Sequence, residues 1–188
     1  MKKFFLFLIL CFATLLDAGT PQVYFSPKDH IADHLIALIQ KETKSIQIAV
    51  YCFTHRGIAE ALLEAKQRGV MVELLVDPYS IKVDAPLEQL VDAGAAVYVW
   101  AVGGKSMRKP IMHHKFCVFG AGLLWTGSFN FTYQAHKANQ ENVLVIDTPE
   151  VIQKYKDQFE ALKKGPCVLY REYLITNPKN EMPLKKTG

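Results

Sequence analysis

Residues 111–132 read IMHHKFCVFGAGLLWTGSFNFT, a stretch that combines strand-forming residues with side chains able to carry chemistry. The segments HHKFCVF and LLWTGS are rich in β-forming residues, and the GAG between them supplies a turn, so the pattern predicts two paired strands. Lysine is almost never fully buried without a partner. Its presence in a core strand, beside two histidines and close to a serine and an asparagine, therefore indicates a functional site.

Apolar residues on both sides of this stretch follow strand and helix patterns in alternation. The near-continuous apolar run VMVELLVD is typical of a strand that is buried on both faces. The alternation predicts an α/β sandwich in which helices cover a mixed, largely buried β-sheet. The expected strands are 22–25, 45–53, 70–77, 95–100, 113–119, 123–128 and 141–147; the expected helices run from an Asp29 cap to Gln40, over 55–69 and 86–94, and from Pro149 to about Lys164.

The bulk composition is that of a globular protein. The chain has 188 residues, 50% of them hydrophobic, which is enough for one compact domain with its own core. The formal net charge of +4 is compatible with an anionic partner without requiring one. Cysteine usage predicts no particular disulfide pairing: no C-x-x-C pair is present, and Cys52 and Cys117 are expected to be buried thiols.

The first 18 residues resemble a targeting segment. Lys2 and Lys3 precede the apolar run Phe4–Leu16, which is too short to span a bilayer comfortably, and the small residue Ala18 follows. We expect residues 1–18 to be a signal peptide, with an uncleaved membrane anchor as the alternative. Residues 19–188 are expected to form the functional domain, exported to the periplasm or associated with a membrane of the cell envelope.

Strand geometry decides which polar side chains can act together. Because side chains alternate faces along a strand, His113 and Lys115 share one face and His114 points to the other. A metal site made of both histidines is therefore not expected. Lysine offers a positive charge and three donors to a phosphoryl oxygen. Ser128 and Asn130, also two residues apart, would add a hydroxyl and an amide.

A neutral imidazole beside such donors can attack phosphorus directly. It needs a partner that fixes its tautomer and supports the positive charge that develops on the ring. Glu141, at the start of the next predicted strand, is the expected carboxylate.

Three motifs together resemble the signature of the phospholipase D superfamily: His113-x-Lys115, the GSFN of residues 127–130, and the NQEN around Glu141. The chain is most similar to the single-motif bacterial members, the Nuc-type endonucleases, and among them to the membrane-associated NucT group. The resemblance implies a phospholipase D-like α/β/α sandwich. It also implies a metal-independent endonuclease that hydrolyses DNA, with single strands favoured over duplex DNA or RNA.

The resemblance further implies a two-step mechanism without metal or cofactor. His113 would attack the phosphodiester to form a phosphohistidine, and a second histidine would protonate the leaving oxygen and then activate water. Because the chain has a single HxK motif, the implied assembly is a homodimer with the site on its two-fold axis. Each subunit would supply His113, Lys115 and Asn130, and Ser128 and Glu141 would complete the catalytic set.

Contacts to the rest of the substrate are expected from residues around the motif. The loop AVGGKSMRKP leads straight into it, and Lys105, Arg108 and Lys109 would form a rim for a polyanion. Phe129 is a candidate for stacking a base, with core packing as the alternative. Lys137 would line the substrate groove, although a plain loop role fits its sequence context equally well.

One position departs from the family pattern. The family motif usually has a structural aspartate where this chain has Gly120, which we interpret as a loss of local turn support. The departure motivates one alternative, a catalytically weak nucleic-acid-binding module for DNA uptake. A second alternative is a phospholipase D or cardiolipin hydrolase, since the catalytic side chains contact only the phosphate.

The remaining histidines have ordinary explanations. His30 and His34 lie four apart on a predicted helix, a spacing that can hold a metal, but a solvated helix face is expected. His55 is expected to cap or border a helix. His136 lies near the site in sequence, where lining the substrate groove with Lys137 and a plain loop role are both open.

Overall fold

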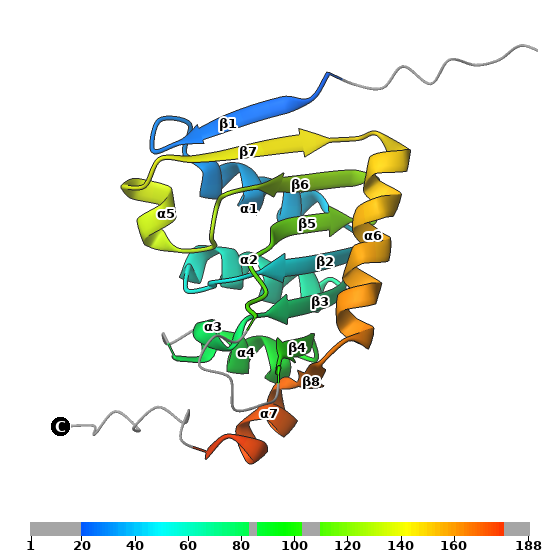
Figure 1. The fold of residues 1–188 in the computed structure, drawn as a ribbon. Coiled ribbons are helices and arrows are strands. Elements are labelled where there is room, and N and C mark those ends of the chain that lie inside the picture. Colours follow the sequence, from blue (N-terminus) through cyan, green and yellow to red (C-terminus); the bar gives the residue numbers. More distant parts are fainter. Residues whose placement is uncertain (1–19, 83–85, 103–109, 179–188) are drawn as a thin grey trace, which may run out of the picture.

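The structure is a computed structural model that describes residues 20–82, 86–102 and 110–178. The described residues form an eight-stranded sheet between two layers of helices (Figure 1). Helices α1 (Ile31–Lys41) and α2 (Arg56–Gln67) cover one face, and α6 (Pro149–Lys164) crosses the other. The predicted α/β/α sandwich with a mixed sheet is therefore confirmed.

The sheet has the order β1-β7-β6-β5-β2-β3-β4-β8. β2 is parallel to β3 and β3 to β4, whereas all other neighbouring pairs are antiparallel. The strands are β1 (Gln22–Ser26), β2 (Ser45–Val50), β3 (Met71–Val76), β4 (Ala96–Trp100), β5 (Lys115–Phe119), β6 (Leu123–Gly127), β7 (Glu141–Ile146) and β8 (Cys167–Leu169). The predicted strand pair thus forms antiparallel β5 and β6 near the middle of the sheet.

Both faces of the central strands are buried, as their apolar sequences predict. Cys117 and Phe119 pack into the core beneath α1 and α2, and Phe116 and Val118 into a second core beneath α6. The alternation confirms the predicted faces of the motif strand. Lys115 therefore lies on the same side of β5 as the α1 and α2 core.

The structure corrects the expected elements in three places. Asp29 does not cap α1; its carboxylate accepts a hydrogen bond from the backbone N–H of Phe25, and His30 occupies the cap position. β2 ends at Val50 rather than at residue 53, because the chain then turns to bridge Phe53 with Phe131. Four short elements were not predicted, because they are too short to show a recognisable sequence period. They are α3 (Pro78–Lys82), α5 (Tyr133–Lys137), β8 and α7 (Tyr170–Thr176). The short helix α4 (Leu87–Asp92) was predicted.

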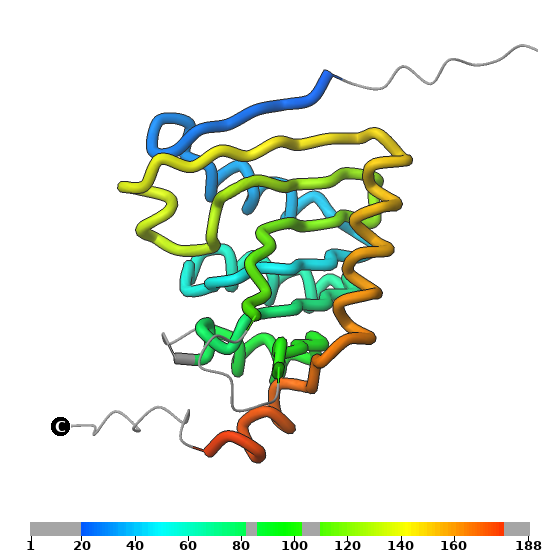
Figure 2. The backbone as a smooth tube through the Cα atoms, in the orientation of Figure 1, coloured from blue at the N-terminus to red at the C-terminus, as the bar shows by residue number. Residues whose placement is uncertain are grey.

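The polar segments lie at one edge of the sheet, the edge that is formed by the ends of the strands and not by an outer strand. β1, β2 and β6 end there, β5 and β7 begin there, and α5 packs beside them (Figure 2). Sequence segments far apart in the chain therefore meet at this edge. Within the described part of the chain, no helix is both long and apolar enough to cross a membrane.

Candidate active site

The HxK motif lies where the chain enters β5. His113 is exposed just before the strand, and Lys115, its first residue, is only 7% exposed. The Lys115 ammonium donates a hydrogen bond to the backbone oxygen of His113 at 2.8 Å. β2 holds this entry in place, because Tyr51 N donates to His114 O at 2.9 Å. The Lys115 ammonium is therefore fixed against the backbone of His113, and the entry to β5 against the segment that follows β2.

Two tyrosines form an aromatic wall beside this pair. The ring of His113 lies against the ring of Tyr51 with centroids 4.7 Å apart, and Tyr51 stacks on Tyr79 at 5.3 Å. The Lys115 ammonium lies 5.3 Å from the Tyr51 ring centroid, within cation–π range. Tyr51 thus contacts both members of the HxK motif, a role that sequence reasoning missed.

Two buried polar side chains that follow β3 position this wall. The Asp77 carboxylate accepts from the backbone N–H groups of Met112 and Tyr79, at 3.0 and 2.9 Å. The Ser80 hydroxyl donates to Tyr51 O at 3.0 Å and accepts from Phe53 N at 3.1 Å. Sequence reasoning missed both residues. The available signal was DPYS directly after a buried parallel strand, at the carboxyl edge where such sheets place their sites.

Ser128 and Glu141 lie together at the same edge. Ser128 Oγ donates to Glu141 Oε2 at 2.5 Å, and Asn139 Nδ2 donates to Glu141 Oε1 at 3.1 Å. Ser26 supports the pair, since its hydroxyl accepts from Glu141 N at 3.2 Å and donates to Asn139 O at 2.9 Å. The Ser128 proton is therefore engaged by Glu141 rather than directed at a ligand. Contact between Glu141 and an imidazole stays a prediction.

The GSFN segment is anchored to the loop after β2. Phe131 N donates to Cys52 O at 3.0 Å, and Phe131 O accepts from Thr54 N and His55 N, both at 2.8 Å. Phe129 is fully buried, so the expectation that it stacks a base is wrong and the core alternative holds. Asn130 Oδ1 is buried without a hydrogen-bond partner among the described residues. A buried acceptor without a partner is unusual. The oxygens of a phosphodiester cannot donate to Oδ1, so a contact with phosphate would come from Nδ2 of the same amide.

The charges favour a neutral histidine beside a cationic lysine. Burial, and then the positive charge of Lys115, lower the pKa of His113, against a weaker opposing effect of Asp77. Burial also lowers the pKa of Lys115, while the negative charge of Glu141 works in the opposite direction. His113 therefore keeps a free lone pair at neutral pH, as a nucleophile requires.

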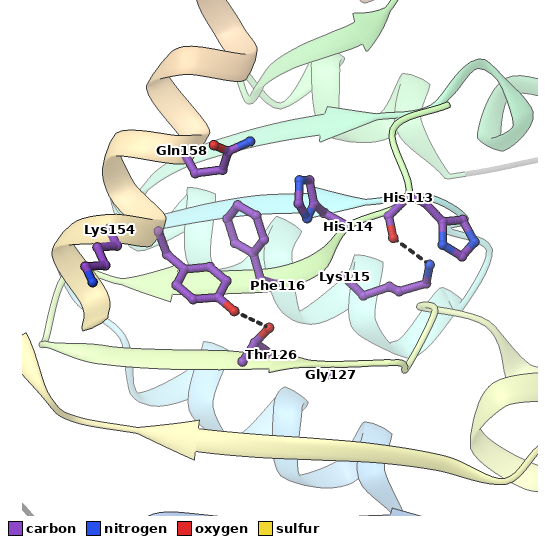
Figure 3. Close-up of a pocket in the computed structure, with 9 residues that line it drawn as sticks. His113, His114, Lys115, Phe116, Thr126, Gly127, Lys154 and Gln158 are labelled. Atoms are coloured by element: carbon purple, nitrogen blue, oxygen red, sulfur yellow. Dashed lines mark hydrogen bonds between the residues drawn. The ribbon is translucent and has the colours of Figure 1, made fainter. Parts of the chain in front are cut away.

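An open pocket of about 280 Å³ adjoins the motif on the α6 side of the sheet. Figure 3 shows His114 and Phe116 between the His113–Lys115 pair and α6, with Lys154 and Gln158 projecting from that helix. Tyr155 packs edge-on against Phe116, and its hydroxyl accepts a hydrogen bond from Thr126 Oγ1 at 3.2 Å. The pocket is lined by His113, His114, Lys115, Phe116, Thr126, Gly127, Lys154, Tyr155 and Gln158.

The expected substrate-binding residues fall into two groups. Lys105, Arg108 and Lys109 lie outside the described residues. Lys137 is exposed at the end of α5, on the edge that carries the site. Its contact with substrate stays a prediction.

Gly120 lies at the end of β5 away from the site and is closely packed. A Cβ there would lie 2.6 Å from Ser45 Oγ and 2.9 Å from Ser45 N. An aspartate at this position would therefore require the neighbouring turn to shift. Whether the departure at Gly120 costs turn support or activity stays a prediction.

We expect Gly120→Asp to lower the free energy of unfolding by about 1–3 kcal/mol, because the added side chain overpacks this turn. Urea unfolding of both proteins measures the change. A gain in stability on introducing the aspartate would contradict the packing argument.

Comparisons with known proteins agree with this geometry. A family model described as "Cardiolipin synthase, PLD-like domain" matches residues 35–163. The chain is 32% identical over 135 residues to mitochondrial cardiolipin hydrolase of Xenopus tropicalis, and 31% identical over 145 residues to a phospholipase D of Rickettsia typhi. These alignments cover 71% and 77% of this chain, and 61% and 68% of the relatives. The chain thus spans about three-fifths of the length of the mitochondrial relative.

Two solved structures have the same fold. Nuc from Salmonella typhimurium, a phospholipase D family member, is matched with a TM-score of 0.71 and NucT from Helicobacter pylori with 0.73. Each match is 26% identical and covers 80% of this chain, and 97% and 99% of those chains respectively. The sandwich fold with an HxK site at the sheet edge defines a phospholipase D-like domain. The chain belongs to the phospholipase D-like family, as its motifs predicted.

Proposed function

We propose that the protein is a metal-independent endonuclease that hydrolyses DNA phosphodiester bonds and favours single strands. The observation that carries the proposal is an exposed His113 with a lowered pKa, held by its own backbone against the buried Lys115 ammonium. This pair presents a nucleophile and a cation to one phosphate. The similarity to Nuc and NucT supports a nucleic-acid substrate.

The reaction proceeds in two displacements. A nitrogen of His113 bonds to phosphorus, and the bond from phosphorus to the leaving oxygen breaks as a second histidine protonates that oxygen. Water then attacks the phosphohistidine, giving a proton to the second histidine and releasing the neutral imidazole. Lys115 and Asn130 hold the phosphoryl oxygens, while Glu141 orients an imidazole.

The second histidine comes from a second copy of the chain, so the active unit is a homodimer with the site on its two-fold axis. Within the described residues, His113 is the histidine that lies beside Lys115, and His114 contacts Phe116 on the opposite face. A two-fold axis close to His113 brings two such residues to one phosphate.

Mixed dimers test this arrangement. When wild-type and His113→Asn chains are unfolded and refolded together in equal amounts, cleavage should fall to about a quarter of that of the same total wild-type chain, because only wild-type pairs contain both histidines. Activity is measured across a series of mixing ratios. A linear dependence on the wild-type fraction would show that each chain cleaves alone.

The pH profile tests the state of His113. Because its pKa is lowered from 6.5, the neutral nucleophile persists below that pH, and the acidic limb of kcat/KM should lie below pH 6.5. Removing the charge of Lys115, in Lys115→Met, should move that limb upwards. Single-turnover cleavage between pH 4.5 and 8 measures the acidic limb of the wild type and of the variant. If the limb of Lys115→Met were not shifted, the effect of the Lys115 charge on the pKa of His113 would be contradicted.

A phospholipase D or cardiolipin hydrolase is the second candidate. The names of the relatives from Xenopus tropicalis and Rickettsia typhi favour it, as do the aromatic side chains of Phe116 and Tyr155 that line the pocket beside the motif. A catalytically weak DNA-binding module is the third candidate, and it would retain labelled DNA without cutting it.

Substrate specificity is decided by incubating the purified protein with single-stranded DNA, duplex DNA, RNA and cardiolipin vesicles, each with excess EDTA. The His113→Asn protein serves as the blank. Cleavage of single-stranded DNA that survives EDTA supports the proposal. Turnover of cardiolipin alone would favour the lipid enzyme, and salt-sensitive binding without turnover would favour the binding module.

The place of action follows from the first 18 residues. We propose that they export the protein or tether it to a membrane, so that the domain acts in the periplasm or at the cell envelope. The mass of the protein recovered from membrane and periplasmic fractions distinguishes a cleaved leader from an anchor.

A further inference from the structure

A second group of ligand-type side chains lies at the same edge of the sheet, apart from the HxK motif. His30 precedes α1, Asp33 lies in its first turn, and His136 comes from α5. One potential ligand atom from each lies within 4.8 Å of the other two. Residues separated by a hundred positions in sequence thus converge.

The pairing differs from the one that the sequence spacing would allow. His34 stacks on Tyr24 with ring centroids 3.9 Å apart, so it turns away from His30. The ring of His30 instead lies near that of His136, with centroids 6.0 Å apart. A spacing of four on one helix suggested the wrong partner, because His30 lies just before the helix rather than on it.

The backbone conformation of His30 and the burial of His136 are unusual for a solvated surface. His30 has φ 49° and ψ 51°, the left-handed conformation, which is costly for a residue other than glycine and is often kept for function. His136 is only 4% exposed. Its Nδ1 lies 3.4 Å from Ala32 N and accepts that N–H, so this nitrogen carries a lone pair, as a metal ligand must.

We propose that His30, Asp33 and His136 form a binding site for a divalent transition metal, with Zn²⁺ the best fit. Two imidazole nitrogens and one carboxylate are a common zinc donor set, which leaves a fourth position for water. A zinc ion would replace the long Ala32 hydrogen bond and draw the exposed His30 and Asp33 side chains inward. His55, whose Nδ1 caps α2 by accepting from Ile58 N, borders the site with its ring 5.6 Å from that of His136.

The metal would act as a clamp rather than as a reagent. It joins the turn after β1 to α5, and the hydroxyl of Ser26 in that strand contacts Glu141 N. The chemistry proposed for His113 needs no metal, so the clamp is independent of the assigned reaction. Loss of the metal would therefore lower the thermal stability of the protein before it affected the reaction.

The test uses the full chain stripped of metal with a chelator and dialysed. Zn²⁺ alone is titrated by calorimetry, and thermal unfolding is followed with and without Zn²⁺. We expect about one Zn²⁺ per chain and a Tm raised by several degrees. His30→Asn, which keeps a residue that tolerates the left-handed backbone, and Asp33→Asn should each weaken binding at least about ten-fold.

The matched control is His34→Asn, the same substitution at a histidine of α1 that lies outside the group of three, which should bind Zn²⁺ as the wild type does. His113→Asn should also bind normally, since it lies at the other site. Absence of saturable binding, or equal binding by the Asp33→Asn protein, would overturn the proposal. Loss of binding in the His113→Asn protein would assign the ion to the HxK motif instead.

Discussion

Replacing His113 with asparagine is expected to lower the rate of phosphodiester cleavage by at least about a thousand-fold. Asparagine keeps a polar side chain at this exposed position but has no nitrogen lone pair that can attack phosphorus. The rate of single-turnover cleavage of a labelled single-stranded oligonucleotide measures the loss. The fold should be unchanged, because the ring of His113 makes its contact with Tyr51 at the surface.

The control for this variant is His34→Asn. It removes an imidazole of α1 that stacks on Tyr24 of β1. We expect its cleavage rate to stay within about two-fold of the wild type, because partly exposed positions away from a site tolerate substitution. Trapping the reaction in acid-free denaturant should show a chain joined through phosphorus to an oligonucleotide fragment in the wild type and none in His113→Asn. Full activity in His113→Asn would exclude the proposed nucleophile.

Replacing Lys115 with methionine should reduce the cleavage rate by about 10²–10³-fold, the usual effect of removing one donor that stabilises a transition-state oxyanion. Methionine fills the buried space of the lysine stem without its charge. The loss should fall mainly on kcat, because the charge on the phosphoryl oxygens increases as the reaction proceeds.

Lys41→Met is the matched control, since Lys41 is an exposed lysine at the end of α1, on the edge of the sheet away from the site. Urea unfolding separates a catalytic effect from a structural one, because Lys115 also donates to His113 O. If Lys115→Met retained the full rate while its stability fell, the lysine would be a structural residue only.

The sequence was sufficient for the architecture. Long periodic segments such as residues 149–164 and the apolar run that forms β3 were recognised because their amphipathic or continuous patterns extend over many residues. The alternation along β5 also predicted that Lys115 and Phe116 lie on opposite faces, as the two core clusters show for this strand. Short elements such as α5 lacked that signal.

The site was predictable where a single segment contains its own geometry. His113 and Lys115 are two residues apart at the entry to one strand, so the period of the strand determines their shared side. Tyr51, Asp77 and Ser80 were missed because they lie outside the motif segment, Tyr51 after β2 and the other two after β3. Their contacts exist only because β2, β3 and β5 are neighbours in the sheet.

The sequence by itself therefore determined the sandwich, the HxK motif and the family, since these depend on periodicity and on residues that are local along the chain. Only the tertiary structure decided that Ser128 bonds to Glu141, that Phe129 is buried, and that His30 meets His136 instead of His34. The physical reason is that these contacts join segments separated by up to about a hundred residues. Their proximity is set by strand order and packing, which no local pattern encodes.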